Sequence, residues 1–321
     1  MNKFQAFSLI MKKQLATLLL AFLAAASARG LEILYTNATF NPGDLQRADI
    51  TLRLTPGTPL LPGLPALIEV SVSNPTSAAM VLPVPTLSEH YNPGNTLDFF
   101  YARGAADAPP TRIANVLPYF GPLKEGLRTE PARLMSLHPG ESWSVLVPVS
   151  YDWIVGNPRL VLQSGPVRLW AKLCAVEPDA NGVWQVQRTR GKRSNVLSFE
   201  VKQPPAADAT GLSDLMWLDH PWLLAAPEAA EHVLQGADFE ALRNLVDRNT
   251  NSVYAIYAKA VLARMYAFGD RLDVHPSRTP DPATGLRLAN EVLQDPRFVL
   301  GEPEGKFRLR LQAQVGERQK Q

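Results

Sequence analysis

The sequence predicts a multidomain protein, with an all-β N-terminal region and a small all-α C-terminal region. Apolar residues recur with a period of two through much of residues 29–204, a pattern typical of strands with one buried face. After residue 211 the period changes to about 3.6, the repeat of an amphipathic helix. The chain also contains 28 prolines in 321 residues, and proline favours turns and edge strands over long helices. At this length we expect two domains, each with a core of its own.

The stretch Pro65–Leu82 is the clearest part of the β region, because it contains two expected strands and the turn between them. Ile68, Val70 and Val72 alternate with polar residues, so this strand buries one face. Asn74–Ser77 then breaks the alternation with a proline, which lacks an N–H donor, and with side chains that bind their own backbone in turns. The same alternation predicts further strands over residues 50–54, 97–101, 143–149, 167–175, 183–187 and 195–201.

Three other segments of the β region are expected to be turns or loops. Asn41–Asp44 and Asp179–Gly182 have the composition of turns, and the second is a hairpin signal. Residues 104–131 are rich in proline and show little periodicity. That stretch predicts either a functional loop or a cap folded over the strands.

The helical region is expected to begin after a linker at residues 205–211, where prolines and small residues separate the two periods. Residues 212–321 then form the helical module. Asp238 is a candidate N-cap for one helix, and Ser252 is a candidate N-cap for the longest helix. Asp281 and the proline after it predict the start of another helix.

Residues 1–28 are expected to be a signal peptide that is removed by cleavage after Ala28. Two lysines precede an apolar run at residues 15–26, and small residues follow that run. The run is too short to span a bilayer comfortably, so an uncleaved anchor is not expected. Translation starts at either Met1 or Met11, and both starts retain this signal. We therefore expect a periplasmic or secreted protein with no transmembrane anchor after cleavage.

Charge and cysteine content argue against several classes of protein. The chain has 32 basic and 30 acidic residues, and three of the basic residues fall in the first 28 positions, which hold no acidic residue. The rest of the chain is nearly neutral, which argues against nucleic-acid binding. The single cysteine, Cys174, excludes an internal disulfide, and its position excludes a lipid on a mature N-terminal cysteine.

Four segments of the β region resemble a known family. PALIEVSVSNPT, LHPGESWSVLVPV, GPVRLWAKLCAV and SNVLSFEVKQP together resemble the immunoglobulin-like (Ig-like) and fibronectin-like β-sandwiches of exported bacterial proteins. The resemblance covers residues 32–204 and implies an antiparallel β-sandwich, without the paired cysteines or the role of antibody domains. In the helical module, Tyr254–Met265 is weakly similar to an inner helix of tetratricopeptide-like repeats, although no repeat of about 34 residues is visible.

The motifs predict no catalytic residue, no metal site and no cofactor. Five histidines are scattered through the chain without metal-ligand spacing, and the GxSxG, P-loop and GxGxxG motifs are absent. Asp214, Asp219 and His220 lie close in sequence, but proximity along a helix does not assemble a catalytic triad. Cys174 is expected to pack as a small apolar residue beside Trp170. We therefore expect a protein that is not an enzyme.

Two groups of residues are candidates for a binding surface. The aromatic group comes from irregular regions that a sandwich can place at one end, and it comprises His90, Tyr91, Tyr101, Tyr119 and Phe120. The basic group is expected at a hairpin tip, and it comprises Arg188, Arg190, Lys192 and Arg193. Core packing is the alternative for the aromatic group, and a solvated hairpin is the alternative for the basic group. Trp217 and Trp222 are candidates for the joint between the two regions.

These observations favour an exported, non-enzymatic binding or scaffold protein whose partner is a protein or a cell-envelope glycan. Two other classes stay open. An extracytoplasmic hydrolase or its accessory subunit requires convergent Asp, Glu or His in a concave pocket. A protease-inhibitor-like protein requires a rigid exposed loop, for which residues 104–131 are the candidate.

Overall fold

The structure of the chain is a computed structural model. It describes residues 39–85, 96–104, 107–113, 132–152, 159–160, 162–224, 236–268 and 280–299. Of these described residues, 30% are helical and 36% lie in strands. The expected signal peptide, residues 1–28, lies outside them. None of the helices in the described ranges is long and apolar enough to cross a bilayer.

The described strands form four antiparallel sheets. A three-stranded sheet has the order β1 (Asp49–Leu54), β2 (Ala66–Ser73) and β7 (Ser142–Val149). A five-stranded sheet has the order β11 (Trp184–Arg193), β10 (Gly165–Pro178), β4 (Leu97–Arg103) and β5 (Thr111–Ile113), and β12 (Leu197–Val201) also pairs with β10. The two-stranded sheets are β3 (Met80–Pro83) with β6 (Leu134–Leu137), and β8 (Tyr151–Asp152) with β9 (Arg159–Leu160).

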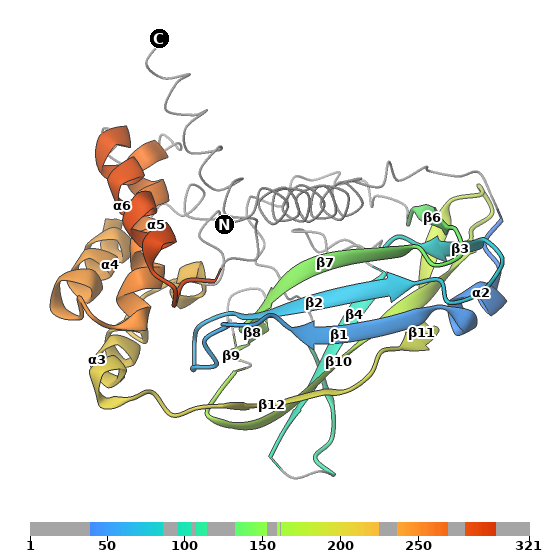
Figure 1. The fold of residues 1–321 in the computed structure, drawn as a ribbon, viewed down its shortest axis with the longest axis horizontal. Coiled ribbons are helices and arrows are strands. Elements are labelled where there is room, and N and C mark those ends of the chain that lie inside the picture. The colour runs from blue at the N-terminus through green and yellow to red at the C-terminus, as the bar shows by residue number, and fades with distance from the viewer. Residues whose placement is uncertain are drawn as a thin grey trace, which may run out of the picture.

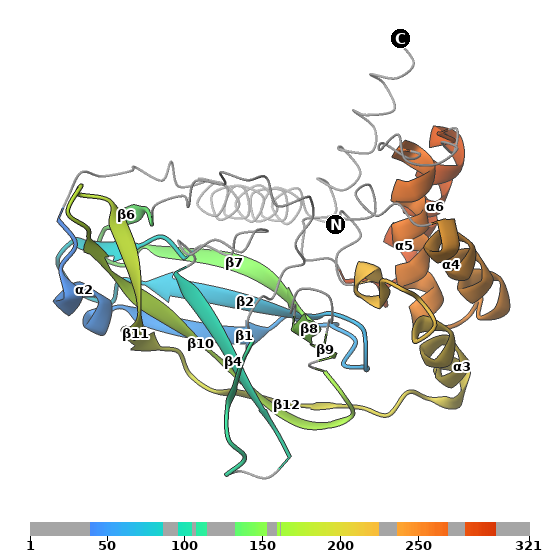
Figure 2. The same cartoon turned by 180° about the vertical axis from the view of Figure 1, so that it is seen from behind.

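The three-stranded and five-stranded sheets share one hydrophobic core. Val70 of β2, Phe99 of β4 and Leu169 of β10 are each at most 1% exposed and belong to this core. The two sheets lie in two layers, with β1, β2 and β7 in front in Figure 1 and β4 and β10 in front in Figure 2. We call the side of the five-stranded sheet that is turned away from the core its outer face.

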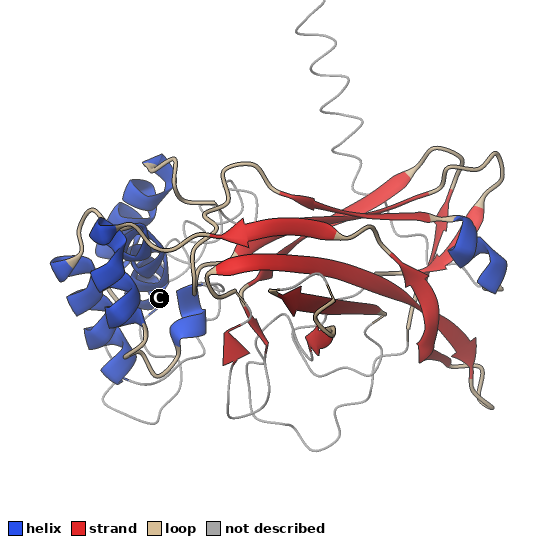
Figure 3. Cartoon of the chain, turned by 90° about the horizontal axis from the view of Figure 1, so that it is seen from below, coloured by secondary structure: helices blue, strands red, loops and turns tan. Residues whose placement is uncertain are grey.

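Helix α5 (Val253–Phe268) is the centre of the helical part, because its side chains are buried on almost every side. Tyr254, Ala258 and Val261 are each 0% exposed, so α5 has no polar face. The helices in contact with it are α3 (Ala206–Leu215), the short 3-10 helix η1 (Pro221–Leu224), α4 (Gly236–Arg248) and α6 (Pro282–Gln294). Figure 3 shows these helices gathered beyond one end of the strands.

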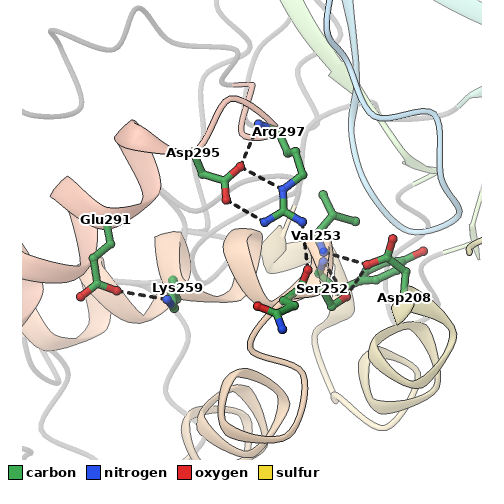
Figure 4. Close-up of polar contacts among 9 residues, drawn as sticks. Asp208, Ser252, Val253, Lys259, Glu291, Asp295 and Arg297 are labelled. Atoms are coloured by element: carbon green, nitrogen blue, oxygen red, sulfur yellow. Dashed lines mark hydrogen bonds and ion pairs between the residues drawn. The ribbon is translucent and has the colours of Figure 1, made fainter. Parts of the chain in front are cut away.

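The N-terminus of α5 is capped from two sides. The hydroxyl of Ser252 accepts a hydrogen bond from the backbone N–H of Tyr254 at 3.2 Å, which confirms Ser252 as the cap. Oδ1 of Asp208 on α3 accepts bonds from the Ser252 hydroxyl at 2.7 Å and from the backbone of Val253 at 2.8 Å (Figure 4). The predicted start of α6 is confirmed too, because Asp281 accepts an N–H from its first turn at 3.0 Å.

The predicted fold class, an Ig-like β-sandwich followed by a separate helical domain, is wrong. The described residues form a mixed structure in which helix α2 (Pro42–Arg47) precedes the first strand, and pairs of short strands accompany the two larger sheets. The connection between β1 and β2 also enters the helical core, where Leu64 is 0% exposed. In the same connection, the backbone oxygen of Pro62 accepts a hydrogen bond from the hydroxyl of Tyr254 at 2.8 Å. Periodicity missed this arrangement because it reports the faces of single elements, not contacts between distant ones.

Two segments that were expected to be irregular are helical. Helix α2 occupies most of the predicted turn at Asn41–Asp44, because the Asn41 side chain accepts an N–H from Gly43 at 2.9 Å and a proline follows at the first helical position. Residues 206–211 of the predicted linker are the first part of α3. Asp208 within this segment caps α5, so the predicted linker is part of the helical structure, which begins at Ala206 after β12 ends at Val201.

Candidate functional site

Two rows of charged and aromatic side chains run across the outer face of the five-stranded sheet. The register places Asp98 of β4 opposite Lys172 of β10, and it places Phe100 opposite Trp170. Ion pairs and ring contacts extend these two pairs to β5 and β11. We call Asp98, Arg112, Lys172 and Arg188 the charged row, and Phe100, Trp170 and Arg193 the aromatic row.

Asp98 is the centre of the charged row. Its side chain is 3% exposed, and its Oδ1 accepts hydrogen bonds from Nη1 of Arg188 at 2.6 Å and from Nη2 of Arg112 at 2.8 Å. Nζ of Lys172 lies 3.9 Å from Oδ2 of the same carboxylate. The two charge-assisted hydrogen bonds compensate for the burial of Asp98. Three cations therefore surround one buried carboxylate, and the row has an excess of positive charge.

Cys174 follows Lys172 on the same face of β10, beside the charged row, and is buried. Its Sγ is 3.5 Å from Oδ2 of Asp98, to which the thiol donates. Burial, reinforced by the charge of Asp98, raises the pKa of the Cys174 thiol to about 12. The thiolate is therefore disfavoured at neutral pH, and Cys174 packs as a small buried residue.

The aromatic row interleaves rings with cations. The rings of Phe100 and Trp170 are stacked, with centroids 6.0 Å apart and an angle of 8° between their planes. Cζ of Arg193 lies 4.2 Å from the Trp170 centroid, and Nζ of Lys172 lies 5.5 Å from the Phe100 centroid. Cations over ring faces are attracted by the quadrupole of the ring. These contacts hold Arg193 and Lys172 above the sheet, where both contribute positive charge.

A bulge in β11 brings Arg188 to the charged row. Cys174 is opposite Gly191, but the next residue of β10, Ala175, is opposite Gln187, so residues 188–190 have no partner on β10. Extra residues of this kind redirect side chains. The strands approach so closely here that a Cβ on Gly191 would lie 2.4 Å from the backbone oxygen of Leu173. Only glycine fits at that position.

The four basic residues predicted at a hairpin tip lie instead in β11. Arg190 forms an ion pair with Glu177, and Nζ of Lys192 donates to the backbone oxygen of Gln46 at 2.7 Å and to that of Ala48. Lys192 therefore ties β11 to the end of α2 and has a structural role. Arg188 and Arg193 are the members of the predicted group that reach the two rows. The predicted position at a hairpin tip is wrong because the long strand with its bulge has the composition of a charged turn.

Four of the five residues of the predicted aromatic group lie outside the described residues, so the group stays a prediction. Tyr101 is 7% exposed and packs in the core on the inner face of β4, so it does not face a ligand. His90, Tyr91, Tyr119 and Phe120 lie outside the described residues, as does most of the loop at 104–131. Trp217 is 81% exposed and does not form a joint. The side chain of Trp222 is also outside the described set.

The binding surface predicted from the sequence did not include Asp98, Arg112 or Lys172. The alternation of β10 already placed Trp170 and Lys172 on one mixed face, and the predicted strand at 97–101 held an Asp and a Phe at alternate positions. The missing information was that β4 pairs with β10. A strand pairing between segments about 70 residues apart is not encoded in either segment alone.

A second polar cluster joins η1 to α4. Oδ2 of Asp238 lies 2.5 Å from Nδ1 of His220, and its Oδ1 accepts the backbone N–H groups of Asp219 at 3.0 Å and His220 at 3.2 Å. Asp238 was predicted to be an N-cap, but α4 begins at Gly236, so the carboxylate anchors the preceding chain instead. In the described ranges no group of three or more His, Cys, Asp or Glu side chains is arranged to hold a metal ion.

Comparisons with known proteins identify no family. No protein-family model matches the chain, and no curated protein matches it. The GH3 β-glucosidase of Bifidobacterium adolescentis is 12% identical, with a TM-score of 0.22 over 48% of this chain and 16% of that one. The β-glucosidase of Listeria innocua is 13% identical, with a TM-score of 0.23 over the same shares. The α-2-macroglobulin of E. coli is 10% identical, with a TM-score of 0.21 over 84% of this chain and 16% of that one. The chain thus spans about 16% of the length of these proteins, and TM-scores this low define no shared fold.

Proposed function

We propose that this is a binding protein that holds an anionic partner on the outer face of its five-stranded sheet. The observation that supports the proposal is the balance of charge in the two rows, where four cations accompany one carboxylate. The cations are Arg112, Lys172, Arg188 and Arg193, and the carboxylate is Asp98. A surface with this balance attracts anions and increases their rate of encounter.

The exposure of the side chains supports the same proposal. The side chain of Asp98 is 3% exposed, whereas those of Arg112, Arg188 and Lys172 are 43%, 35% and 23% exposed. The carboxylate therefore lies beneath the cations, and part of each cation reaches solvent. An anionic group that approaches the face meets the cations first, and it can form charge-assisted hydrogen bonds without displacing Asp98.

The expected export of the chain is consistent with a partner in the cell envelope, either an acidic glycan or an acidic protein surface. The first test uses a generic polyanion, dextran sulfate, and the matching neutral dextran. Binding of the purified full chain is measured by isothermal titration calorimetry at low and at moderate salt. We expect dextran sulfate to bind, neutral dextran not to bind, and affinity to fall as salt screens the charges.

A pair of double variants with equal loss of charge makes the test specific. Arg112→Gln with Arg188→Gln removes two cations from the charged row, and we expect binding to weaken about tenfold or more. Arg190→Gln with Arg287→Gln removes two cations that lie outside the two rows and pair with Glu177 and Glu291, and it should change binding less than twofold. Equal weakening by both double variants, or no binding of dextran sulfate, would refute the proposal. Thermal melting of each variant reports whether the fold is retained.

A further inference from the structure

We infer that the guanidinium groups of Arg112 and Arg188 form a binding site for the carboxylate of an acidic sugar, whose ring lies against Phe100. This inference rests on the proposed function and narrows it to one class of ligand, a glycan that contains uronic acid. Three observations lead to it: the convergence of two guanidinium groups on one oxygen, the adjacency of Phe100 to Arg112, and the burial of Asp98 beneath them.

The two arginines come from strands on opposite sides of the β10–β4 pair. Arg188 extends from β11 and Arg112 from β5, and both donate to the same atom, Oδ1 of Asp98. The two nitrogens that bond to Asp98 are therefore close enough for one small anionic group to contact both guanidinium groups. A guanidinium has five N–H donors in a planar fork, and the contact with Asp98 involves one nitrogen of each arginine. The forks can therefore bind a second carboxylate above the first.

The aromatic ring of Phe100 lies next to this carboxylate-binding site. Phe100 is directly opposite Arg112 in the pairing of β4 with β5, and paired residues of adjacent strands have Cβ atoms about 5 Å apart. Phe100 is half-buried and stacked on Trp170, and Nζ of Lys172 lies 5.5 Å from its ring centroid, so a sugar would contact the remaining exposed part of the ring. An acidic sugar carries its carboxylate one bond outside a pyranose ring. A guanidinium and an aromatic ring in adjacent positions therefore match the two parts of such a residue.

The same geometry favours a sugar over an acidic peptide. The carboxylates of Asp and Glu stand on flexible chains without a ring, so a peptide gains nothing specific from Phe100. Asp98 is a positioning residue in this arrangement, because it holds two arginines that would otherwise repel each other. Replacing Asp98 is expected to weaken binding because the two arginines lose their position, and not because a contact with the ligand is lost.

The experiment compares three probes of similar size by calorimetry with the full chain. They are the tetramer of galacturonic acid, the neutral tetramer of galactose and a tetra-aspartate peptide. We expect the galacturonate tetramer to bind at least about tenfold more tightly than either of the others. Arg188→Lys keeps the charge but removes the fork, and we expect a severalfold loss of galacturonate affinity. Arg190→Lys makes the same exchange on the same strand, at a residue that pairs with Glu177, and it should leave this affinity unchanged.

The variant Phe100→Leu separates the inference from the proposed function. It removes the ring but keeps an apolar side chain, so we expect weaker galacturonate binding with unchanged binding of dextran sulfate. Equal affinity for tetra-aspartate and galacturonate, with no effect of Phe100→Leu, would overturn the inference and leave the proposed function standing. Failure of every anionic probe, dextran sulfate included, would overturn both. Melting curves report whether Arg188→Lys and Phe100→Leu retain the fold.

Discussion

At the scale of single residues, buried or half-buried aspartates connect elements that are distant in sequence. Asp98 joins three neighbouring strands through its cations, and Asp208 joins α3 to α5. Asp238 holds the chain before η1 on α4, and Asp44 of α2 accepts the backbone N–H of Val81 on β3 at 3.1 Å. Each of these carboxylates accepts at least two hydrogen bonds, which offsets the cost of its burial. This chain has a single cysteine, so these hydrogen bonds connect distant segments in the way that disulfides do in other proteins.

The pair of Asp295 and Arg297 predicts a measurable dependence of stability on pH. Asp295 accepts Nε of Arg297 at 3.0 Å and Nη2 at 2.8 Å, and Nη1 of Arg297 donates to the backbone oxygen of Asn251 at 2.9 Å (Figure 4). The hydrogen bond from the Arg297 side chain lowers the pKa of Asp295 below its ordinary value of 3.8. A lowered pKa in the folded state contributes stability that is present above 3.8 and is lost as pH falls through the folded value.

We therefore expect Asp295→Asn to reduce the free energy of unfolding by about 0.5–1 kcal/mol at pH 7, since the pair is partly exposed to solvent. The difference from the parent chain should shrink as pH falls below 3.8. Urea unfolding of both chains at several pH values measures this difference. A loss of stability that is the same at all pH values would contradict the assignment of the effect to charge.

At the scale of elements, the sequence predicted those features whose causes are local. The turn after β2 forms as expected, because Asn74 Oδ1 accepts the backbone N–H of Thr76 at 2.9 Å. The hairpin before β11 forms because Asp179 Oδ1 accepts the N–H groups of Asn181 at 2.8 Å and Val183 at 2.9 Å. Phe99 is buried in the core and Phe100 is half-buried on the outer face, as the pleat of a strand requires.

The features that the sequence did not predict depend on pairing between distant segments. The bulge that places Arg188 beside Asp98 exists because β10 continues past it and pairs with both parts of β11. No local pattern distinguishes such a bulge from a charged turn, since both contain glycine and exposed cations. The candidate site was therefore half visible in the sequence: the face of β10 was predicted correctly, but its partners Asp98 and Arg112 were not.

The contact between α5 and α6 predicts an unusual response to a glycine substitution. A Cβ added to Gly285 of α6 would lie 2.6 Å from the backbone oxygen of Ala263 and 2.9 Å from the backbone nitrogen of Ala267. Alanine is favoured over glycine inside a helix by about 1 kcal/mol. Because the neighbouring atoms belong to backbone, they cannot move aside, and overpacking costs about 1–3 kcal/mol. The propensity gain offsets part of that cost, so we expect Gly285→Ala to destabilise the protein by up to about 2 kcal/mol net.

Urea unfolding measures this cost, and Asn290→Ala on the same helix is the matched control. Residue 290 is half-buried and not part of the helical core, so alanine there should stabilise by a few tenths of a kcal/mol through helix propensity. A gain in stability for Gly285→Ala would show that the two helices can separate without cost.

At the scale of the whole molecule, the connection between β1 and β2 joins the sheets to the helices. Leu60 packs against the core of the sheets, whereas its neighbour Leu61 packs against the helical core. The backbone oxygen of Leu60 accepts the N–H of Lys202 at 2.8 Å, just after the last strand. Leu64 belongs to the helical core, as does Tyr254, whose hydroxyl donates to the backbone oxygen of Pro62 in the connection. The connection is thus part of both cores, and we expect the two parts to unfold together.

This expectation is tested by removing the contacts of the connection. Leu64→Ala deletes a fully buried side chain, and we expect a loss of about 2–4 kcal/mol, because the cavity forms in the helical core. Hydrogen exchange followed by mass spectrometry reports separately on peptides from β10 and from α5. If the two parts form one cooperative unit, protection in both sets of peptides should fall by the same free energy in this variant. A fall confined to α5, with β10 unchanged, would show instead that the helices open independently of the sheets.

The double variant Leu61→Ser with Leu64→Ser removes the apolar contacts that these two residues make with the helical core. We expect protection of α5 to fall further than that of β10 in this variant, because the helices then lose the side chains that connect them to the sheets.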